Sequence, residues 1–358
     1  MPAIWLIDAY RAGERGQVRA LAESLARLPG WTLRTLSLEY RTAVVWPHVF
    51  GTSSLSGITA STAAQLHAPW PDLVITCGVR NEPVCRWLRR QSSGQTRYVH
   101  VGRPWGPLHQ FDLVITTPQY RVADAPNVLN NALTLHQLDA SRLARAAATA
   151  QARYADLGGP YIAVNLGGNS GPFTLGPKAA RRLAQQASAL AESRGASLLI
   201  STSARTPAAA IDALAGSLTV PHSLYRWKPN DADNPYVGIL GLASEIIVTA
   251  DSIAMLSEAC ATGKPVHMFD LGGMRQEDPA AVEIDTRIAA TLYGILLRFF
   301  WKRLSRDITL VHKMLQANGL AHWLCDRSSA GVACSELPRT VDAVQRLVGD
   351  TAAAVDVD

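Results

Sequence analysis

The stretch 245–266 constrains the fold more than any other part of this chain. An apolar run there predicts a buried strand, and the small polar turn 249–252 ends it. A helical pattern follows over 253–261, Gly263 and Pro265 mark its end, and a second apolar run begins directly afterwards. The turn therefore presents hydroxyls and free backbone N–H groups at a helix N-terminus, where an anion binds well.

Predicted strands and helices alternate along the whole chain, which favours parallel sheets of the α/β class. The 358 residues are enough for two domains, each with a core of its own. We place an N-terminal, acceptor-binding domain at 1–155 and a hinge at 158–160. A second, donor-binding domain follows at 159–335, and a C-terminal helix and tail occupy 336–358. A helix predicted over 140–154 connects the two domains.

A second motif lies at the predicted start of the second domain. The apolar strand 161–166 is followed by Gly167, Gly168, Asn169 and Ser170. Glycine lets a backbone approach a phosphate closely, and the polar side chains add hydrogen bonds. The loop matches neither the P-loop nor the GxGxxG fingerprint. Taken alone, each motif also fits an ordinary strand–helix–strand unit that binds no ligand.

Three further elements make the pattern specific. They are Ser-Thr-Ser-Ala-Arg-Thr-Pro over 201–207, Arg-Trp at 226–227 and Asn-Pro-Tyr at 234–236. Together with the two motifs above, they resemble a bacterial and plant family of mitochondrial-fission-factor-like glycosyltransferases. The resemblance is strong over 160–268 and weak toward the N-terminus. The chain departs from the family at Ala204, where an arginine is usual. If that arginine contacts the donor in the family, either Arg205 does so here or the affinity for the donor is altered.

The resemblance implies the GT-B architecture, in which two Rossmann-like α/β/α domains face each other across a cleft. It assigns the donor phosphates to Ser252 and the donor ribose to Glu258, with the leaving group stabilised without a metal. Met255 also fits a core position. The donor-binding residues implied are Gly167, Gly168, Asn169, Ser170, Ser203, Arg205, Trp227, Asn234, Asp251, Ser252, Met255 and Glu258. Neither a cofactor nor a metal site is expected.

Acceptor chemistry is expected in the first domain, because ligands bind beyond the carboxyl ends of parallel strands. A carboxylate there can deprotonate the acceptor hydroxyl, and Asp8 and Glu14 are the candidates. Alternatively, Asp8 caps the turn after the first strand and Glu14 is a solvated loop acid. His100 and His109 fit structural roles better than catalysis. The acceptor-side candidates are Asp8, Arg11, Glu14, Gly78, Arg80, Arg103 and Gln119.

Composition narrows the partners and the compartment. A net charge of +5 without a nucleic-acid-binding motif points to anionic substrates or a membrane surface, not to nucleic acid. Five cysteines without zinc spacing fit reduced thiols in the cytoplasm. The N-terminus reads as a strand instead of a signal peptide, and no apolar run reaches the roughly 18 residues of a membrane helix. The basic, aromatic stretch 288–306 predicts either contact with the inner membrane or a helix that bridges the domains.

The family resemblance implies a glycosyltransferase, and the composition adds a cytoplasmic location with peripheral contact to the inner membrane. The resemblance further implies that it moves a sugar from a nucleotide-diphosphate sugar to a cell-envelope glycan or lipid-linked acceptor of the lipopolysaccharide-core type. One alternative is a sugar-nucleotide 2-epimerase of the same fold, which needs no acceptor. Another is a non-catalytic adaptor that recruits a fission GTPase to membranes and has no need of an intact set of ligand loops. A dehydrogenase is disfavoured, because no GxGxxG follows the first strand.

Overall fold

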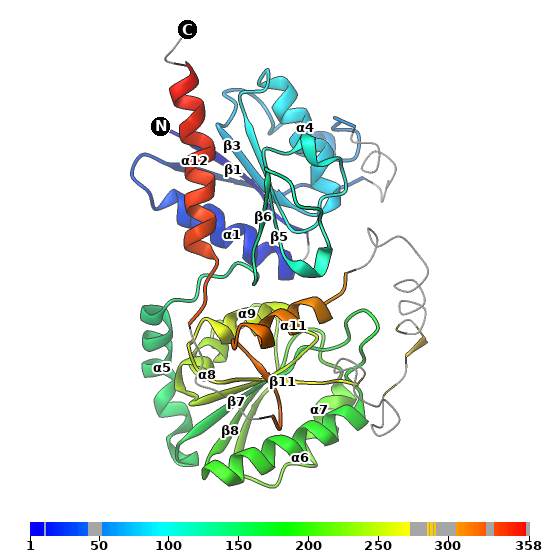
Figure 1. Cartoon of the computed structure of the whole chain (residues 1–358), viewed down its shortest axis with the longest axis vertical. Coiled ribbons are helices and arrows are strands. Elements are labelled where there is room, and N and C mark those ends of the chain that lie inside the picture. Colours follow the sequence, from blue (N-terminus) through cyan, green and yellow to red (C-terminus); the bar gives the residue numbers. More distant parts are fainter. Residues whose placement is uncertain are drawn as a thin grey trace. The chain divides into compact units, whose positions relative to one another are not determined.

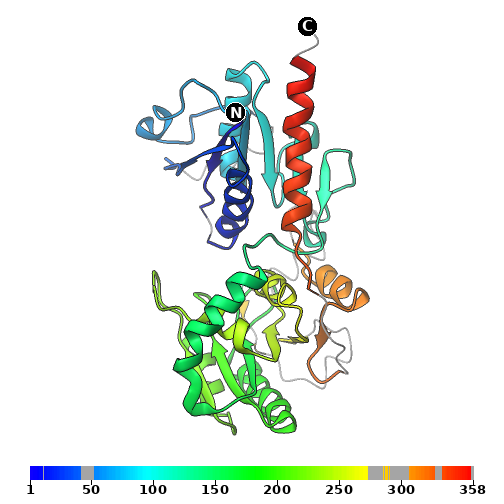
Figure 2. The ribbon, with the colours of Figure 1, turned by 90° about the vertical axis from the view of Figure 1, so that its left-hand side faces the viewer.

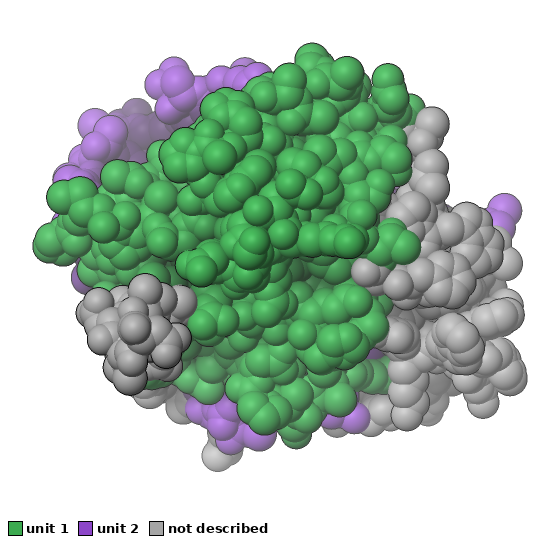
Figure 3. Space-filling model, turned by 90° about the horizontal axis from the view of Figure 1, so that it is seen from above, with its two compact units in different colours: residues 1–137, 336–358 green, residues 138–335 purple. Residues whose placement is uncertain are grey.

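The computed structural model describes residues 1–10, 12–41, 52–272, 285, 287, 288, 290, 306–326 and 333–355. The chain divides into two compact units, coloured separately in Figure 3. Unit 1 comprises 1–137 and 336–358, and unit 2 comprises 138–335. Each unit is built on a parallel six-stranded sheet with helices on its faces, which confirms the predicted α/β class (Figure 1).

The sheet of unit 1 has the strand order β2-β1-β3-β4-β5-β6. Its strands are β1 (Ala3–Ile7), β2 (Thr32–Leu36), β3 (Leu73–Cys77), β4 (Arg97–Val101), β5 (Leu113–Thr116) and β6 (Val128–Asn130). Its helices are α1 (Ala12–Ala26), α3 (Ala60–Ala63), α4 (Glu82–Gln91) and α12 (Leu337–Val355), with short 3-10 turns η1 (Val79–Asn81), η2 (Leu108–Gln110) and η3 (Pro118–Tyr120).

Alternating side chains of the strands in unit 1 build a core on each face of the sheet. Ile4 and Leu6 of β1 pack in the core that α1 and α12 cover, whereas Trp5 and Ile7 pack in the core that α4 covers. Strand β3 is buried at all five positions, as expected for a central strand of a parallel sheet. The carboxyl ends of these strands are therefore held rigidly from both sides.

The C-terminal helix α12 returns to unit 1 and lies along it (Figure 2). Val344 is fully buried in the core that contains α1. The Asn131 amide donates a 2.9 Å hydrogen bond to Thr340 Oγ1, and Glu336 Oε1 accepts a 2.7 Å bond from the Ala132 N–H. These contacts tie the end of the chain to the loop after β6.

The sheet of unit 2 has the strand order β12-β11-β10-β7-β8-β9. Its strands are β7 (Tyr161–Asn165), β8 (Ser197–Ser201), β9 (His222–Tyr225), β10 (Glu245–Thr249), β11 (Val266–Phe269) and β12 (His322–Trp323). Its helices are α5 (Ala140–Tyr154), α6 (Pro177–Arg194), α7 (Ala208–Ala215), α8 (Tyr236–Leu242), α9 (Ile253–Cys260) and α11 (Thr309–Ala317), with a 3-10 turn η4 (Ala155–Leu157). The strand order reverses between β7 and β10, and ligands bind at such a switch point in folds of this kind.

Helix α5 packs on α8 and so belongs to unit 2, whereas the sequence placed a domain boundary after it, at 155–159. A Cβ at Gly238 would lie 2.5 Å from the Ala150 Cβ, and one at Gly241 would lie 2.6 Å from the Leu143 carbonyl oxygen. Both glycines are thus needed for this close helix contact. Local periodicity predicts the helix but not its packing partner.

The strand, turn, helix and strand predicted over 245–266 are present as β10, α9 and β11. Gly263 has φ +69°, the left-handed conformation expected where the helix stops. The basic stretch 288–306 falls almost wholly outside the described residues. Within the described chain, every helix is too short or too polar to span a bilayer.

Candidate functional site

Three loops meet at the carboxyl ends of β10, β7 and β8, which are neighbours in the sheet of unit 2. The Gly167 N–H donates to Thr249 Oγ1 over 2.7 Å, and the Gly168 N–H donates to Asp251 Oδ2 over 2.9 Å. Thr206 Oγ1 donates to the Gly167 carbonyl over 2.6 Å. The motifs found separately in the sequence are therefore joined into one loop cluster, comprising 167–171, 202–207 and 249–252.

The two glycines of the first loop let the loop cluster close on itself. A Cβ at Gly167 would lie 2.5 Å from Asp251 Oδ2, and a Cβ at Gly168 would lie 2.1 Å from the Arg205 carbonyl oxygen. The second distance is impossible without moving the backbone. Glycine is thus required here by packing within the protein, in addition to any close approach of a phosphate.

Asp251 ties the loop cluster together from inside. Its carboxylate is buried, accepts the Gly168 N–H and lies 3.3 Å from the Arg205 guanidinium. Burial raises the pKa of Asp251, and the charge of Arg205 opposes that shift. These contacts give Asp251 an internal role, which the motif alone did not indicate.

Three guanidinium groups contact the turn 169–171. Arg205 Nη1 donates to the Asn169 carbonyl over 3.3 Å, and Arg287 Nη2 donates to the Gly171 carbonyl over 3.1 Å. Arg306 Nη2 donates to Ser170 Oγ. The sequence predicted Arg205, gave Arg287 no role and placed Arg306 in the basic stretch 288–306, for which membrane contact and a domain-bridging helix were the alternatives. No local signal connects Arg287 or Arg306 to a loop more than a hundred residues earlier in the chain.

The N-terminus of α9 opens directly after this loop cluster. The first helical hydrogen bond runs from the Leu256 N–H to the Ser252 carbonyl over 3.0 Å. The N–H groups of 253–255 precede it and have no acceptor within the helix. The Ser252 side chain is buried and does not cap the helix, and Met255 is half-buried. This arrangement suits a phosphate group.

Glu258 lies further along α9 and is held by a neighbouring helix. The Tyr236 hydroxyl donates to Glu258 Oε2 over 2.6 Å. Burial raises the pKa of Glu258, while the Tyr236 hydrogen bond and Arg142 oppose the shift. Burial and the Glu258 charge also raise the pKa of Tyr236 well above its ordinary value, so the phenol stays a donor. The carboxylate is therefore pre-oriented on the helix that carries the phosphate-binding end.

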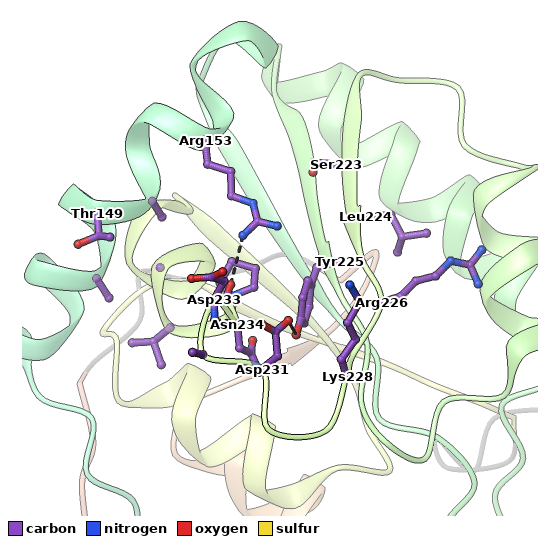
Figure 4. A pocket seen from close by; sticks show the side chains of 16 residues that line it. Thr149, Arg153, Ser223, Leu224, Tyr225, Arg226, Lys228, Asp231, Asp233 and Asn234 are labelled. Carbon is purple, nitrogen blue, oxygen red and sulfur yellow. Dashed lines mark hydrogen bonds between the residues drawn. The ribbon is translucent and has the colours of Figure 1, made fainter.

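The segment after β9 contributes an aromatic side chain and a pocket. The Trp227 N–H donates to Thr202 Oγ1 over 2.8 Å, which fixes the segment to the loop cluster, and the indole is 40% exposed. A pocket of about 890 Å³ lies between α5, β9 and the loop 231–235 (Figure 4). Its walls include Arg153, Tyr225 and Lys228 but no residue of the loop cluster or of α9.

The two acids predicted in unit 1 differ in their surroundings. Asp8 is buried, and its carboxylate lies 2.6 Å from Arg19 Nη2 and 3.3 Å from Arg15 Nε. It also accepts the Ala9 N–H over 3.0 Å, as the turn-capping alternative required. Glu14 is half-buried in the first turn of α1, and the Cys77 thiol at the end of β3 lies 3.8 Å from its Oε2.

The remaining acceptor-side candidates follow strand ends as expected, except Arg11, which lies outside the described residues. Gly78 and Arg80 follow β3, Arg103 follows β4, and Gln119, in η3 after β5, is buried and donates to Thr117 Oγ1 over 3.0 Å. His100 is buried between the Tyr98 hydroxyl and the Arg103 carbonyl, and burial lowers its pKa, which keeps it neutral. His109 is exposed in η2. Across the described residues, no group of three His, Cys, Asp or Glu side chains could hold a metal ion.

Comparison with known proteins now decides the family. Residues 12–281, three quarters of the chain, match the family described as mitochondrial fission ELM1. The chain belongs to the mitochondrial fission ELM1 family.

Two relatives, one from a plant and one from a bacterium, resemble this ELM1-family chain in sequence. Mitochondrial fission protein ELM1 of Arabidopsis thaliana is 29% identical over 238 residues, which cover 60% of this chain and 55% of that protein. The chain thus matches little more than half the length of the plant relative. An uncharacterized protein of Rickettsia prowazekii is 26% identical over 298 residues, covering 74% of this chain and 82% of that protein.

Solved structures agree on the fold. The UDP-GlcNAc 2-epimerase of Methanocaldococcus jannaschii matches with a TM-score of 0.50 at 10% identity, covering 96% of this chain and 99% of that chain. A glycosyltransferase of Rickettsia africae matches with a TM-score of 0.49 at 12% identity, covering 98% of each chain. The match at a TM-score of 0.50, together with the two parallel sheets, confirms an α/β fold of the GT-B type for the ELM1-family chain.

One residue assigned to the donor has a different set of contacts. Asn234 Oδ1 accepts the Tyr236 N–H over 3.0 Å and lines the pocket at β9. Its described contacts therefore start α8 instead of reaching the loop cluster. The positioning role of Tyr236 was not predicted, although the Asn-Pro-Tyr motif was the signal that could have found it.

Proposed function

We propose that this chain is a glycosyltransferase whose nucleotide-diphosphate sugar binds at the loop cluster of unit 2. One observation carries the proposal. Beyond the carboxyl ends of β10, β7 and β8, a glycine loop, an arginine loop and the N-terminus of α9 converge, with Glu258 on the same helix. This position and these groups are those that a diphosphate joined to a ribose requires.

Each group has a chemical role in the proposal. The N–H groups at the start of α9 bind the diphosphate beside the loop 167–170, and Glu258 accepts hydrogen bonds from the ribose. The diphosphate gains negative charge as the sugar leaves, and Arg205 and Arg306 stabilise that charge. We propose that these fixed cations and the helix N-terminus act without a metal.

The acceptor side of the proposal belongs to unit 1. Of the two predicted acids, we favour Glu14 for deprotonating the acceptor hydroxyl, because Glu14 is half-buried whereas Asp8 is buried beside two arginines. The acceptor itself, a cell-envelope glycan or lipid-linked sugar of the lipopolysaccharide-core type, is proposed from the family resemblance. Peripheral attachment to the inner membrane and a cytoplasmic location are proposed on the same ground.

Two other functions are distinguished by simple outcomes. A 2-epimerase, the activity named for the Methanocaldococcus structure, would release an epimerised sugar from the donor alone. A fission adaptor, as the name of the Arabidopsis relative suggests, would bind no nucleotide sugar. The contacts that join Gly168, Asp251 and Arg205 into one loop cluster favour a ligand-binding protein over the adaptor.

The proposal is tested by the thermal shift of purified chain with UDP-, GDP-, ADP-, dTDP- and CMP-linked sugars. Ligand at about a hundred times its Kd stabilises the folded state by about 2.7 kcal/mol. We expect a rise in Tm with one base, lost in Glu258→Ala and retained in Asp156→Ala, which removes an exposed acid of the same unit. If none of the nucleotide sugars raises the Tm of the wild-type chain, the proposed donor site is wrong.

A further inference from the structure

The carboxyl ends of neighbouring strands in unit 1 carry two groups of aromatic and arginine side chains. In the first group, the Arg80 guanidinium lies 5.4 Å from the ring centroids of both Tyr10 and Tyr40. The two rings meet edge to face at 5.9 Å. Tyr10 follows β1, Tyr40 follows β2 and Arg80 follows β3, so the group spans the point where the strand order reverses.

The second group repeats this design on the next strands. The Arg103 guanidinium lies 5.7 Å from the ring centroids of both Trp105 and Tyr120. Arg103 and Trp105 follow β4, and Tyr120 ends the 3-10 turn after β5. The two groups thus occupy the ends of β2, β1, β3, β4 and β5, which are consecutive in the sheet.

A glycine of positive φ lies beside one ring of each group. Gly78 has φ +83°, and a Cβ there would lie 2.8 Å from the Tyr10 ring. Gly102 has φ +97°, and its Cβ would lie 4.0 Å from the Tyr120 ring. The left-handed conformation turns the chain at the strand end, and at Gly78 the missing Cβ gives the ring its place.

Buried polar side chains hold both groups in position. The Tyr40 hydroxyl donates to Asn81 Oδ1, and the buried Asn81 amide donates to the Cys77 carbonyl over 3.1 Å. The fully buried Glu82 accepts the Trp105 N–H over 2.7 Å and the Gly106 N–H over 2.9 Å. The aromatic and arginine side chains are therefore attached to a preorganised backbone.

From this row we infer that unit 1 binds a sugar that carries a phosphate or carboxylate group. Aromatic faces pack against the C–H groups of a sugar ring, and guanidinium groups form paired hydrogen bonds with phosphate and carboxylate. Within the described chain, Arg80 has no carboxylate at ion-pair distance, so its charge is open to an anionic ligand. The inference rests on the proposed function in one respect: it takes this site as the acceptor site.

The test is saturation-transfer NMR on the full chain with four probes. Glucose 1-phosphate and glucuronate carry both ring and charge, methyl glucoside carries the ring alone, and glycerol 3-phosphate carries a headgroup-like phosphate alone. We expect the two anionic sugars to bind about tenfold more tightly than either single-feature probe. The inference would be overturned if methyl glucoside or glycerol 3-phosphate bound as tightly as the two anionic sugars. It would also be overturned if none of the four probes showed binding.

Variants locate the site. Arg80→Gln and Arg103→Gln should each weaken the anionic sugars about tenfold, whereas Arg90→Gln, an exposed arginine on α4, should not. Each variant's Tm shows that it is folded. If Arg80→Gln and Arg103→Gln are both folded and bind like Arg90→Gln, the site is wrong. A nucleotide shift without sugar binding refutes this inference alone, and sugar binding without any nucleotide shift refutes the donor proposal alone.

Discussion

The Tyr236 hydroxyl donates a 2.6 Å hydrogen bond to Glu258 Oε2 and so joins the start of α8 to the middle of α9. The bond leaves Glu258 Oε1 without a hydrogen-bond partner among the described residues. The Asn234 side chain accepts the Tyr236 N–H, which fixes the backbone from which the phenol extends. The Asn-Pro-Tyr motif is thereby connected to the residue proposed to bind the ribose.

Replacing Tyr236 by Phe should weaken nucleotide binding about tenfold by leaving Glu258 unoriented. The loss should fall on the ribose, so that the preference for a ribonucleotide over its 2′-deoxy form shrinks. Titration calorimetry with both forms measures this preference. Tyr225→Phe, which removes a hydroxyl bonded to Asp231 at 2.7 Å elsewhere in unit 2, is the matched control. An unchanged preference in Tyr236→Phe would show that the hydrogen bond is structural only.

The pH dependence of stability should change in Glu258→Gln. Burial raises the pKa of Glu258 in the folded chain above its ordinary value. Between the two pKa values, the folded chain keeps a proton that the unfolded chain has lost, so stability falls as pH rises through that window. Glu258→Gln cannot titrate at this position, so its stability does not fall in this way as pH rises.

Urea unfolding between about pH 4 and pH 8 measures the effect. The free energy of unfolding of Glu258→Gln, minus that of wild type, should increase as pH rises and then level off. The buried Asp251, whose pKa is also raised, is present in both chains and contributes equally. A difference that stays constant with pH would contradict the shifted pKa of Glu258.

Gly168→Ala should destabilise unit 2 by about 1–3 kcal/mol, because its Cβ would lie 2.1 Å from the Arg205 carbonyl oxygen. Gly216→Ala is the matched control, since its Cβ meets nothing closer than 3.4 Å and its φ is −74°. Denaturant unfolding of both variants gives the comparison. Equal stability of the two would mean that the loops do not close on each other as described.

Arg306→Gln should weaken diphosphate binding while leaving the fold intact. The side chain donates to Ser170 Oγ in the loop proposed to bind the diphosphate. We expect the advantage of a nucleoside diphosphate over its monophosphate to shrink about tenfold. Lys178→Gln removes another cation of unit 2 as a control. If the diphosphate advantage is the same in both variants, Arg306 has no part in the site.

The sequence was sufficient for the elements whose signals are local. The turn 249–252, the helix α9 and the left-handed Gly263 could all be read from apolar periodicity and residue type. The order of motifs along the chain also implied the architecture. Parallel strands place their carboxyl ends on one edge, so loops that are distant in sequence can be expected there together.

Contacts between distant segments were out of reach of that reasoning. Nothing in the composition of α5 indicates that it packs against Gly238 and Gly241 of α8. Likewise, nothing in the sequence near Arg306 indicates its hydrogen bond to Ser170. For Asp8, the sequence correctly predicted a position directly after β1. It did not predict that two arginines would pair with the carboxylate. Side-chain pairing depends on tertiary packing, which periodicity does not encode.

The most direct test of the donor site is calorimetric titration of wild type and Glu258→Ala with the nucleoside diphosphate selected by the thermal-shift screen. We expect one binding site per chain in the wild type and an affinity at least about tenfold weaker in the variant. Wild-type chain that binds no nucleoside diphosphate, or a variant that binds it equally well, would contradict the assignment of α9 as the donor-binding helix.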